Sequence, residues 1–378
     1  TRNDDQRWQG SNWNMVFVGD TNAPQPSWPN PPFTVAATTP LVREKPYLTI
    51  DSANHYSVVV PPLKTNSQGT DWTTAGTSVS IDHFHIANPN VDTVATLNAA
   101  LAQGKHLLFT PGVYHLNGTL RITQPGTIVL GLGLATLIAD NGVALISIDD
   151  IDDATIAGLL LEAGPQSSNT LLEVGAPGSS LDHSANPTVL FDVHCRVGGA
   201  GVGTAASCVT INSNHVLGDN LWLWRADHGA GADWNTNKSD HGLIVNGHDV
   251  TIYGLFVEHF QKYQTLWNGD RGTVYFYQSE MPYDPPNQTA WQESAGKNGY
   301  PSYKVADGVQ THHAMGIGVY GVFNNDVTAD NAIETPINAG TVLNHLVTVS
   351  LASGAIAHII NGTGGAVGHG TMTAFSGD

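Results

Sequence analysis

The feature of this sequence that most constrains its fold is a pattern that occurs twice between residues 246 and 280. Asn246 opens an Asn-Gly turn, an apolar run follows, and Glu258 stands twelve residues after that asparagine. Asn268 opens a second Asn-Gly turn, and Glu280 again stands twelve residues later. The two glutamates are therefore 22 residues apart, about one coil of a parallel β-helix.

The same offset occurs earlier in the chain. Asp150 precedes Glu162 by twelve residues, and Asn212 precedes Trp224 by twelve. Equal offsets from equivalent turns put these side chains at one position of successive coils, a position that carries Glu162, Trp224, Glu258 and Glu280. We expect Glu162 to be an ordinary outward residue, because no aromatic cluster surrounds it in the sequence.

The remaining two glutamates form a candidate acid pair. Coils of a β-helix stack at the interstrand spacing of about 4.8 Å. Two carboxylates that close repel each other, so one pKa of the pair should rise and a proton should stay bound near neutrality. A carboxylic acid that keeps its proton near neutrality is what a general acid requires, so we predict that Glu258 and Glu280 are catalytic.

Composition restricts the partners of the chain. Only 12% of the 378 residues are charged, 41 are glycine, and the net charge is −18 with 14 Lys and Arg. This balance excludes a nucleic-acid partner and an anionic membrane surface, and it disfavours a polyanionic substrate. No apolar run approaches the roughly 18 residues of a membrane span. The histidines lack a metal-site spacing, and the acidic turn at residues 149–153 is expected to be solvated, so we predict neither a metal nor a cofactor.

Two cysteines stand thirteen residues apart, Cys195 and Cys208. The loop-like sequence between them would allow a disulfide across neighbouring coils, and two buried free thiols are the alternative; the spacing leaves both open. Low lysine content, abundant Thr, Asn and Gly and the acidic balance are typical of a secreted, extracellular protein.

The order of segments predicts two parts. Residues 1–89 are rich in proline, lack the coil pattern and are expected to be an extended connector with a few strands. Residues 91–104 have helical spacing and end at a glycine, so they are expected to form a short helix that caps the open end of the solenoid. Short β-rich segments separated by Gly, Asn or Asp follow, which makes residues 90–378 an all-β solenoid.

Aromatic residues are concentrated near the acid pair. Fifteen of the thirty lie between residues 222 and 303, and we expect Phe256 and Phe276 among them to face the core. Aromatic faces beside carboxylates suit a neutral polysaccharide or oligosaccharide, whose C–H faces stack while its hydroxyls bind acids and amides. The predicted substrate-binding residues are Trp224, Asp227, Trp234, Tyr263, Trp267, Asn268 and Tyr283.

Three stretches in this region resemble a known family. RADHGAGADW, GLFVEHFQKYQTLWNG and YFYQSEMPYDPPNQ look like the second half of bacterial glycoside hydrolase family 55, the exo-β-1,3-glucanases that act on laminarin. The resemblance runs from about Trp13 to the C-terminus and is most specific over residues 219–311. It implies a right-handed parallel β-helix of the pectin-lyase type, with glucose released from the non-reducing end of the glucan and its anomeric configuration inverted.

The resemblance also implies roles for single residues. It matches Glu280 to the general acid, Glu258 to a second carboxylate of the pocket, and Trp224, Asp227 and Tyr283 to the subsite of the terminal glucose. Its two tandem β-helices imply that a companion N-terminal half is absent from this chain. Carboxyls one coil apart are closer than the roughly 6.5–9.5 Å typical of inverting enzymes, so Glu258 is not expected to be the base.

Two alternatives remain open at this stage. Another β-helix hydrolase or lyase would need a basic residue beside an acidic sugar, and activity on pectin rather than laminarin would identify it. A carbohydrate-binding β-helix without turnover would bind sugar even after loss of Glu280.

Overall fold

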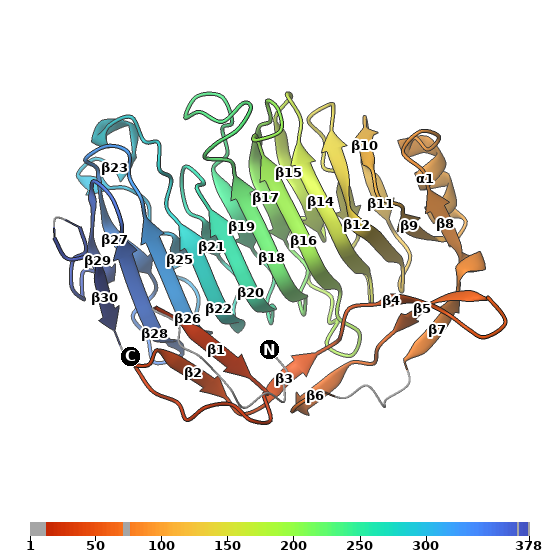
Figure 1. The fold of residues 1–378 in the computed structure, drawn as a ribbon, viewed down its shortest axis with the longest axis horizontal. Coiled ribbons are helices and arrows are strands. Elements are labelled where there is room, and N and C mark those ends of the chain that lie inside the picture. Colours follow the sequence, from red (N-terminus) through yellow and green to blue (C-terminus); the bar gives the residue numbers. More distant parts are fainter. Residues whose placement is uncertain (1–12, 71–75, 369, 377–378) are drawn as a thin grey trace.

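Short apolar strands wind into coils that stack along one axis, as the computed structural model shows for residues 13–70, 76–368 and 370–376 (Figure 1). Strands of successive coils pair in parallel, and each pairs with the equivalent strand of the next coil. The all-β parallel β-helix expected from the sequence is therefore confirmed.

One side of the solenoid is a sheet of twelve strands. Its members are β8 (Phe84–Ala87), β9 (His106–Phe109), β10 (Val113–Leu116), β12 (Ile128–Ala139), β14 (Thr155–Ala163), β16 (Val189–Val197), β18 (Leu217–Arg225), β20 (Thr251–Glu258), β22 (Gly272–Glu280), β26 (His312–Gly321), β28 (Thr341–Ser350) and, antiparallel at the end, β30 (Thr373–Ser376).

The facing sheet has nine shorter strands, all parallel. They are β11 (Leu120–Ile122), β13 (Ile146–Ile148), β15 (Ser168–Val174), β17 (Ala205–Ile211), β19 (His241–Val245), β21 (Thr265–Trp267), β25 (Tyr303–Val305), β27 (Thr328–Glu334) and β29 (Ala355–Ile360). Alternate side chains of both sheets point inward and form one continuous apolar core along the axis. A small hairpin of β23 (Gln292–Ser294) and β24 (Lys297–Asn298) and a 3₁₀ turn at Gln288–Ala290 lie in the insertion between β22 and β25.

The long strands bend at one equivalent position in seven successive coils. The residue at the bend has a positive φ in each case: Gly158 (68°), Asp192 (45°), Asn220 (59°), Gly254 (68°), Phe276 (64°), Gly316 (71°) and His345 (61°). Glycine, asparagine and aspartate tolerate this left-handed conformation, which is unusual for phenylalanine. The bend divides each long strand into a first part and a second part, and the second parts end beside Glu258 and Glu280.

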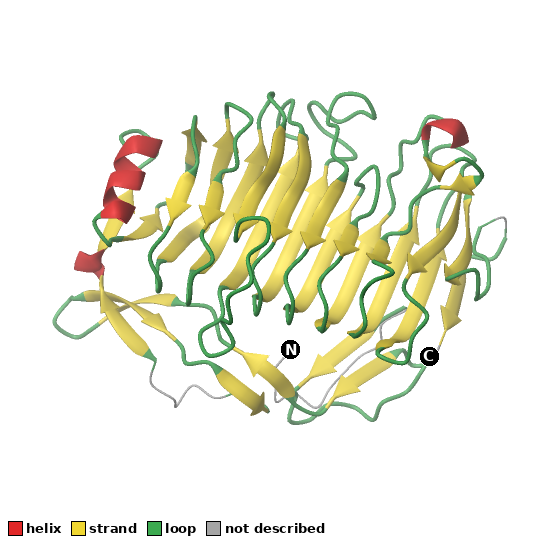
Figure 2. Ribbon diagram, turned by 180° about the vertical axis from the view of Figure 1, so that it is seen from behind, coloured by secondary structure: helices red, strands yellow, loops and turns green. Residues whose placement is uncertain are grey.

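A single α-helix lies at the open end of the described solenoid (Figure 2). This helix, α1 (Val94–Ala102), begins at Thr93, whose side chain accepts from the backbone of Thr96 in a capping box. Its buried face of Leu97, Ala100 and Leu101 covers the first coil, as the sequence predicted. Within the described residues, no helix is long and apolar enough to cross a membrane.

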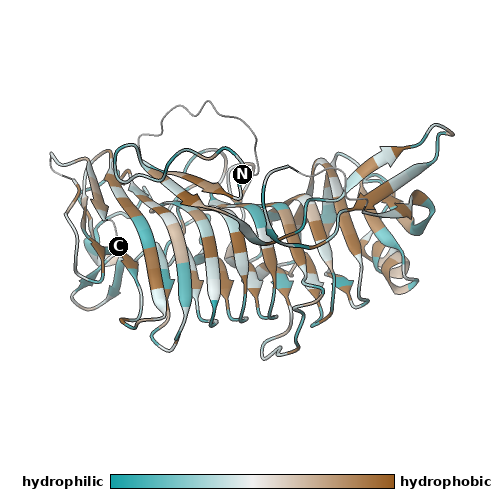
Figure 3. Cartoon of the chain, turned by 90° about the horizontal axis from the view of Figure 1, so that it is seen from below, coloured by the Kyte–Doolittle hydropathy of each residue, from teal (hydrophilic) through white to brown (hydrophobic). Residues whose placement is uncertain are grey.

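The N-terminal segment packs against the solenoid along its length, so it is part of the folded domain and not only an extended connector. Its strands are β1 (Met15–Val18), β2 (Phe33–Ala36), β3 (Thr39–Val42), β4 (Tyr47–Ile50), β5 (Tyr56–Val60), β6 (Lys64–Ser67) and β7 (Thr77–Ser80), followed by a 3₁₀ turn at Ile81–His83. Viewed from below, the segment crosses the strands of the solenoid (Figure 3). Residues 1–12 and 71–75 of the expected connector lie outside the described residues.

Polar and apolar contacts fix this N-terminal segment, residues 13–83. Arg43 forms an ion pair with Asp153, and Lys45 lies 2.7 Å from Asp192. A second, smaller core joins Val58 of this segment to outward apolar side chains of the long sheet, among them Leu108, Leu130, Ala157 and Phe191. The expected boundary at residue 89 is too late, because β8 at Phe84–Ala87 already pairs with β9 in the long sheet.

The two cysteines form a disulfide between the two sheets. Cys195 on β16 and Cys208 on β17 both point into the core, and the distance between their Cα atoms is 6.0 Å. The structure thus selects the bonded alternative of the two that the spacing left open.

Candidate active site

The predicted column of side chains exists in the strand register. Glu258 pairs with Glu280 on the next coil and with Trp224 on the preceding coil. Read along the sheet, the register-aligned residues are Glu162, Arg196, Trp224, Glu258, Glu280 and Tyr320. The twelve-residue offset from the Asn turns therefore predicted the stacking correctly.

Glu162 forms an ion pair away from the acid pair. Its carboxylate is 2.5 Å from the guanidinium of Arg196 on the neighbouring coil, and the residue is 6% exposed. A glutamate neutralised in this way agrees with the ordinary role expected for Glu162.

Glu258 is the member of the acid pair whose pKa is raised. The indole Nε1 of Trp222 donates to its Oε2 at 2.9 Å. Burial raises the pKa of Glu258 to about 7, and the charge of Glu280 adds to the rise, while hydrogen bonds from Trp222 and Gln278 oppose it. One pKa of the pair is thus raised, as expected, but burial rather than the spacing of the carboxyls is the largest cause.

Glu280 is held by donors on both carboxyl oxygens. The hydroxyl of Tyr283 donates to Oε2, and Nε2 of Gln278 donates to Oε1 at 3.2 Å. Burial and the charge of Glu280 raise the pKa of Tyr283, so this phenol keeps its proton. The ring nitrogen Nε2 of His259 lies 3.8 Å from Oε2 of the same carboxyl, and burial lowers the pKa of His259, which favours the neutral ring.

The ring of His259 lies between Asp227 and Glu280 of the acid pair. Asp227 follows β18, and its Oδ1 is 3.8 Å from His259 Nε2 and 2.8 Å from His228 Nδ1. The ring of His259 packs edge-on against Tyr283 with centroids 4.3 Å apart. Asp227 and Tyr283 therefore lie on the same side of Glu280, and polar side chains line that side of the acid pair.

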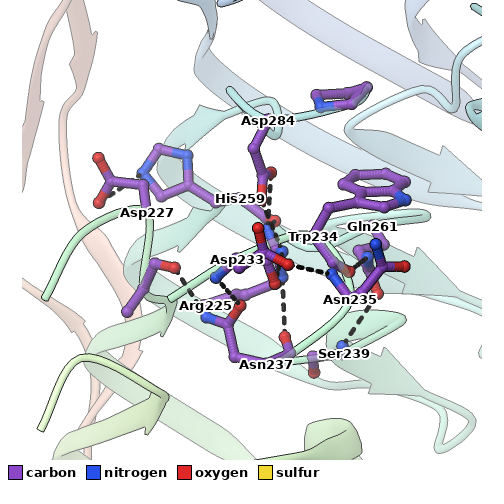
Figure 4. A network of polar contacts seen from close by, with 12 residues as sticks. Arg225, Asp227, Asp233, Trp234, Asn235, Asn237, Ser239, His259, Gln261 and Asp284 are labelled. Carbon is purple, nitrogen blue, oxygen red and sulfur yellow. Dashed lines mark hydrogen bonds and ion pairs between the residues drawn. The ribbon is translucent and has the colours of Figure 1, made fainter. Parts of the chain in front are cut away.

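A buried arginine organises the loops that carry these residues (Figure 4). Arg225 is 0% exposed and forms two hydrogen bonds of 2.9 Å with Asp284. Its other donors reach the carbonyl oxygens of Asn237, Asp233 and His259. The loops after β18, β20 and β22 are thus tied to one guanidinium beneath the site.

Three predicted sugar contacts are wrong or have another role. Trp267 is 0% exposed, because its position on β21 points into the core. Asn268 donates to Asn246 at 2.8 Å in a ladder of turn asparagines. It precedes β22, whereas Glu280 ends β22, and a nine-residue strand separates them by roughly 25–30 Å. Trp234 lies over the guanidinium of Arg225, 5.6 Å from its ring centroid, and so packs against the network.

Tyr263 belongs to a second cluster. Its hydroxyl donates to Glu293 at 2.5 Å, and its ring stacks on His241 with centroids 5.6 Å apart. The charged groups that affect it are Glu293 and Glu334 rather than the acid pair. The expected inward positions of Phe256 and Phe276 are also wrong, since both are half-buried on the outer side of the sheet, 5.4 Å apart.

Sequence reasoning missed several residues around the acid pair. Trp222 and Gln278 each stand two residues before a member of the column, so strand alternation puts them on the same outward face. That periodicity was available in the sequence. The ion pair of Arg225 with Asp284 had no local signal, because its members are 59 residues apart and arginine is rarely fully buried.

Comparison with known proteins places the chain among related sequences and structures. The family model of the LAM55 pectate lyase-like domain matches residues 84–280. An exo-beta-1,3-glucanase of Streptomyces sp. (strain SirexAA-E / ActE) is 47% identical over 363 residues, which is 94% of this chain and 60% of that protein. The chain thus spans three fifths of the length of this relative.

Two solved structures are similar over nearly the whole chain. The structure of sacteLam55A from Streptomyces sp. SirexAA-E matches with a TM-score of 0.94 and 45% identity, over 97% of this chain and 67% of that one. A glutamate-to-alanine variant of the same protein in complex with glucose matches with a TM-score of 0.95 and 44% identity, over 98% and 68%. Within the described residues, no group of three or more His, Cys, Asp or Glu side chains is placed to hold a metal ion.

Proposed function

This chain belongs to the LAM55 pectate lyase-like domain family, and from that membership we propose that it is the acid-bearing part of a hydrolase of β-1,3-glucan. The observation that carries the proposal is the acid pair, with Glu258 and Glu280 on neighbouring coils and Asp227, His259 and Tyr283 around them. The name of the Streptomyces relative supports β-1,3-glucan as the substrate, and the glucose complex of its variant supports a saccharide ligand.

Glu280 is the proposed general acid. Near neutrality the raised pKa of Glu258 keeps a proton beside Glu280. Glu280 delivers that proton to the glycosidic oxygen, because it lies beside the polar side chains of Asp227 and Tyr283 that would bind the terminal sugar. Glu258, whose pKa is raised to about 7, keeps a proton in the pair near neutrality, and it also binds sugar hydroxyls.

The reaction proposed is inverting and releases glucose from the non-reducing end. Carboxyls on adjacent coils are too close to leave room for the attacking water of an inverting enzyme. The base or water-holding residue is therefore proposed to lie outside this pair, in a companion N-terminal β-helix half. The stacked rings of Trp222 and Trp224, 5.8 Å apart, would contact the leaving-group side of the glucan.

We propose that the protein acts outside the cell. The disulfide between Cys195 and Cys208 supports this, since disulfides persist in oxidising compartments. A lyase is disfavoured because Arg225, the basic residue next to the site, is fully buried and bonded to Asp284.

The test compares Glu280→Gln with Glu162→Gln in the full-length natural protein. Glu162 occupies the same column on an earlier coil and is the matched control. Glu280→Gln should lower laminarin hydrolysis on the order of 10²–10⁴-fold while oligosaccharide binding persists. Glu162→Gln should leave hydrolysis close to wild type.

Two further measurements separate the alternatives. An aryl β-glucoside, if cleaved, should lose less activity in Glu280→Gln, since its leaving group needs little protonation. The first glucose released should be the α-anomer by NMR. Early β-anomer, internal cleavage products, or sugar binding without any turnover by the wild-type protein would contradict the proposed function.

A further inference from the structure

Gln278 lies on the outward face of β22, two residues before Glu280. It belongs to the column next to the acid pair, in register with Phe256 on the preceding coil and Gly318 on the following coil. The residue therefore lies between the two acids and the outward aromatic side chains Phe256 and Phe276.

The space around the Gln278 side chain is restricted on both sides. Phe256 occupies the preceding rung. Gly318 leaves the following rung without a side chain, and the ring of Tyr320 folds back over it: a Cβ at Gly318 would meet the Tyr320 hydroxyl at 2.8 Å. Since Tyr320 is itself the rung partner of Glu280, the glutamine is enclosed between two aromatic rings and is directed toward the acids.

The amide group of Gln278 contacts Glu280 and affects the pKa of Glu258. Its Nε2 donates to Glu280 Oε1 at 3.2 Å, and hydrogen bonding from Gln278 lowers the pKa of Glu258 against the effect of burial. Its oxygen Oε1 is buried and has no hydrogen-bond partner among the described residues. A buried acceptor without a partner destabilises a fold, so an apolar side chain of the same shape would suit this position better if packing were its only role.

We propose that Gln278 is a positioning residue for the reaction, whose amide nitrogen fixes the orientation of the Glu280 carboxyl. The proposal rests on the proposed glycosidase function. With Oε1 of Glu280 held by Gln278, its Oε2 is turned toward Tyr283 and His259, the side where the terminal sugar is proposed to bind. Without the amide, the carboxyl would rotate and deliver its proton in a less favourable geometry.

Several other ionisable groups face the acid pair and contribute to any pH dependence measured there. They come from the loops after β18, β20 and β22 and from the next coil, and they are Asp227, His228, His259, Tyr283 and Tyr320.

The experiment replaces the amide by an apolar side chain of similar shape, Gln278→Met, in the full-length natural protein. We expect kcat on laminarin to fall about 10–100-fold, with a change in KM of less than about threefold. The melting temperature should be unchanged or higher, because the buried unpaired acceptor is gone. The ¹³C titration of the Glu258 carboxyl should move upward, because a donor that lowers its pKa is removed.

Two further variants separate positioning from packing. Gly318→Ala displaces the Tyr320 ring and should give a smaller kcat loss in the same direction. Gln292→Met, at a glutamine in the β23–β24 hairpin, should change neither kcat nor the Glu258 titration. Gln278→Met activity within twofold of wild type, or a kcat loss matched by a lower melting temperature, would overturn the proposal.

The NMR titration also distinguishes failure of this proposal from failure of the proposed function. If the wild-type protein cleaves no β-1,3-glucan, the proposed function is wrong. The positioning role in that reaction is then also wrong, even if the Glu258 titration moves in Gln278→Met. If the wild-type protein cleaves the glucan, and Gln278→Met changes neither kcat nor the Glu258 titration, the function stands and the positioning role is wrong.

Discussion

Glu258 and Glu280 occupy equivalent positions on two neighbouring coils, as register partners of β20 and β22. Adjacent strands are about 4.8 Å apart, and the charge of Glu280 raises the pKa of Glu258 in addition to the larger effect of burial. A change at Glu280 should therefore be seen in the titration of Glu258.

The first prediction concerns Glu258→Gln. The raised pKa of about 7 at Glu258 means that the pair loses its proton as the pH rises through neutrality. Activity that needs the proton should then fall on the basic side of the pH profile. Glu258→Gln removes the carboxyl whose raised pKa keeps a proton in the pair, so the proton needed for catalysis is lost earlier and the basic limb of kcat/KM should move to lower pH. A basic limb that stays in place would show that Glu258 does not control the proton.

The second prediction concerns the hydrogen bond from Trp222 to Glu258. Trp222→Phe keeps an aromatic ring in the stack with Trp224 but removes the indole donor. Because that hydrogen bond lowers the pKa of Glu258, its loss should raise the pKa further. Carboxyl ¹³C NMR measures the shift. Trp224→Phe is the matched control and should leave the titration of Glu258 unchanged; equal shifts in both variants would contradict the role of the indole.

The third prediction concerns the buried ion pair of Arg225 with Asp284. Arg225→Met leaves Asp284 without its partner and three carbonyl oxygens without their donor. The free energy of unfolding should fall by about 3–5 kcal/mol in denaturant titrations. Arg225→Met with Asp284→Asn should be less destabilised than the sum of the single variants, because the uncompensated charge is gone. Strict additivity would show that the two side chains do not interact.

The coils and the acid pair could be predicted from the sequence because a two-residue turn signal fixes the register of each strand. One repeated offset then determines which side chains stack. It was harder to predict which side chains of a short strand point into the core and which point outward. Trp267 stands next to an Asn-Gly turn, and an aromatic residue at such a coil corner is expected to be exposed. The three-residue strand β21 nevertheless points its side chain into the core.

The packing of the N-terminal segment could not be predicted from the sequence. Its strands pair with each other rather than with the coils, and its contacts join residues far apart in the chain. The hydroxyl of Tyr253, for example, donates to the carbonyl oxygen of Leu41, 212 residues earlier. Proline-rich sequence with isolated strands is equally typical of a free linker, so composition alone did not distinguish the two.

The fourth prediction uses Asp219 on β18. Burial raises its pKa to about 7, and the charges of Glu44 and Asp192 contribute. In the unfolded chain its pKa is near 3.8, so the folded state binds the extra proton between these values. Stability from this group therefore falls as the pH rises toward 7 and stays lower above it. Asp219→Asn should match wild type near about pH 4 and be more stable above about pH 7, by on the order of 1–3 kcal/mol.

Asp192 provides the matched contrast for this prediction. Although burial acts in the opposite direction, its hydrogen bonds with Lys45 and Asn220 lower its pKa. Its contribution to stability is present above the pKa of the unfolded aspartate and is lost in acid. Asp192→Asn should thus destabilise the protein at neutral pH, opposite in sign to Asp219→Asn. Calorimetric melting temperatures across pH check both, and a common sign would contradict the assignment.

The course of the N-terminal segment has a consequence for how the molecule comes apart. It is bound to the last coils through Trp28, which stacks on His345, and it enters the first coil at Phe84. In a solenoid without such a segment, each coil is stabilised only by its neighbours, so the terminal coils can unfold one at a time. Here the N-terminal segment contacts both ends of the solenoid, so neither terminal coil can unfold before this segment dissociates. Under load or attack by proteases, the coils should consequently fail together rather than in sequence.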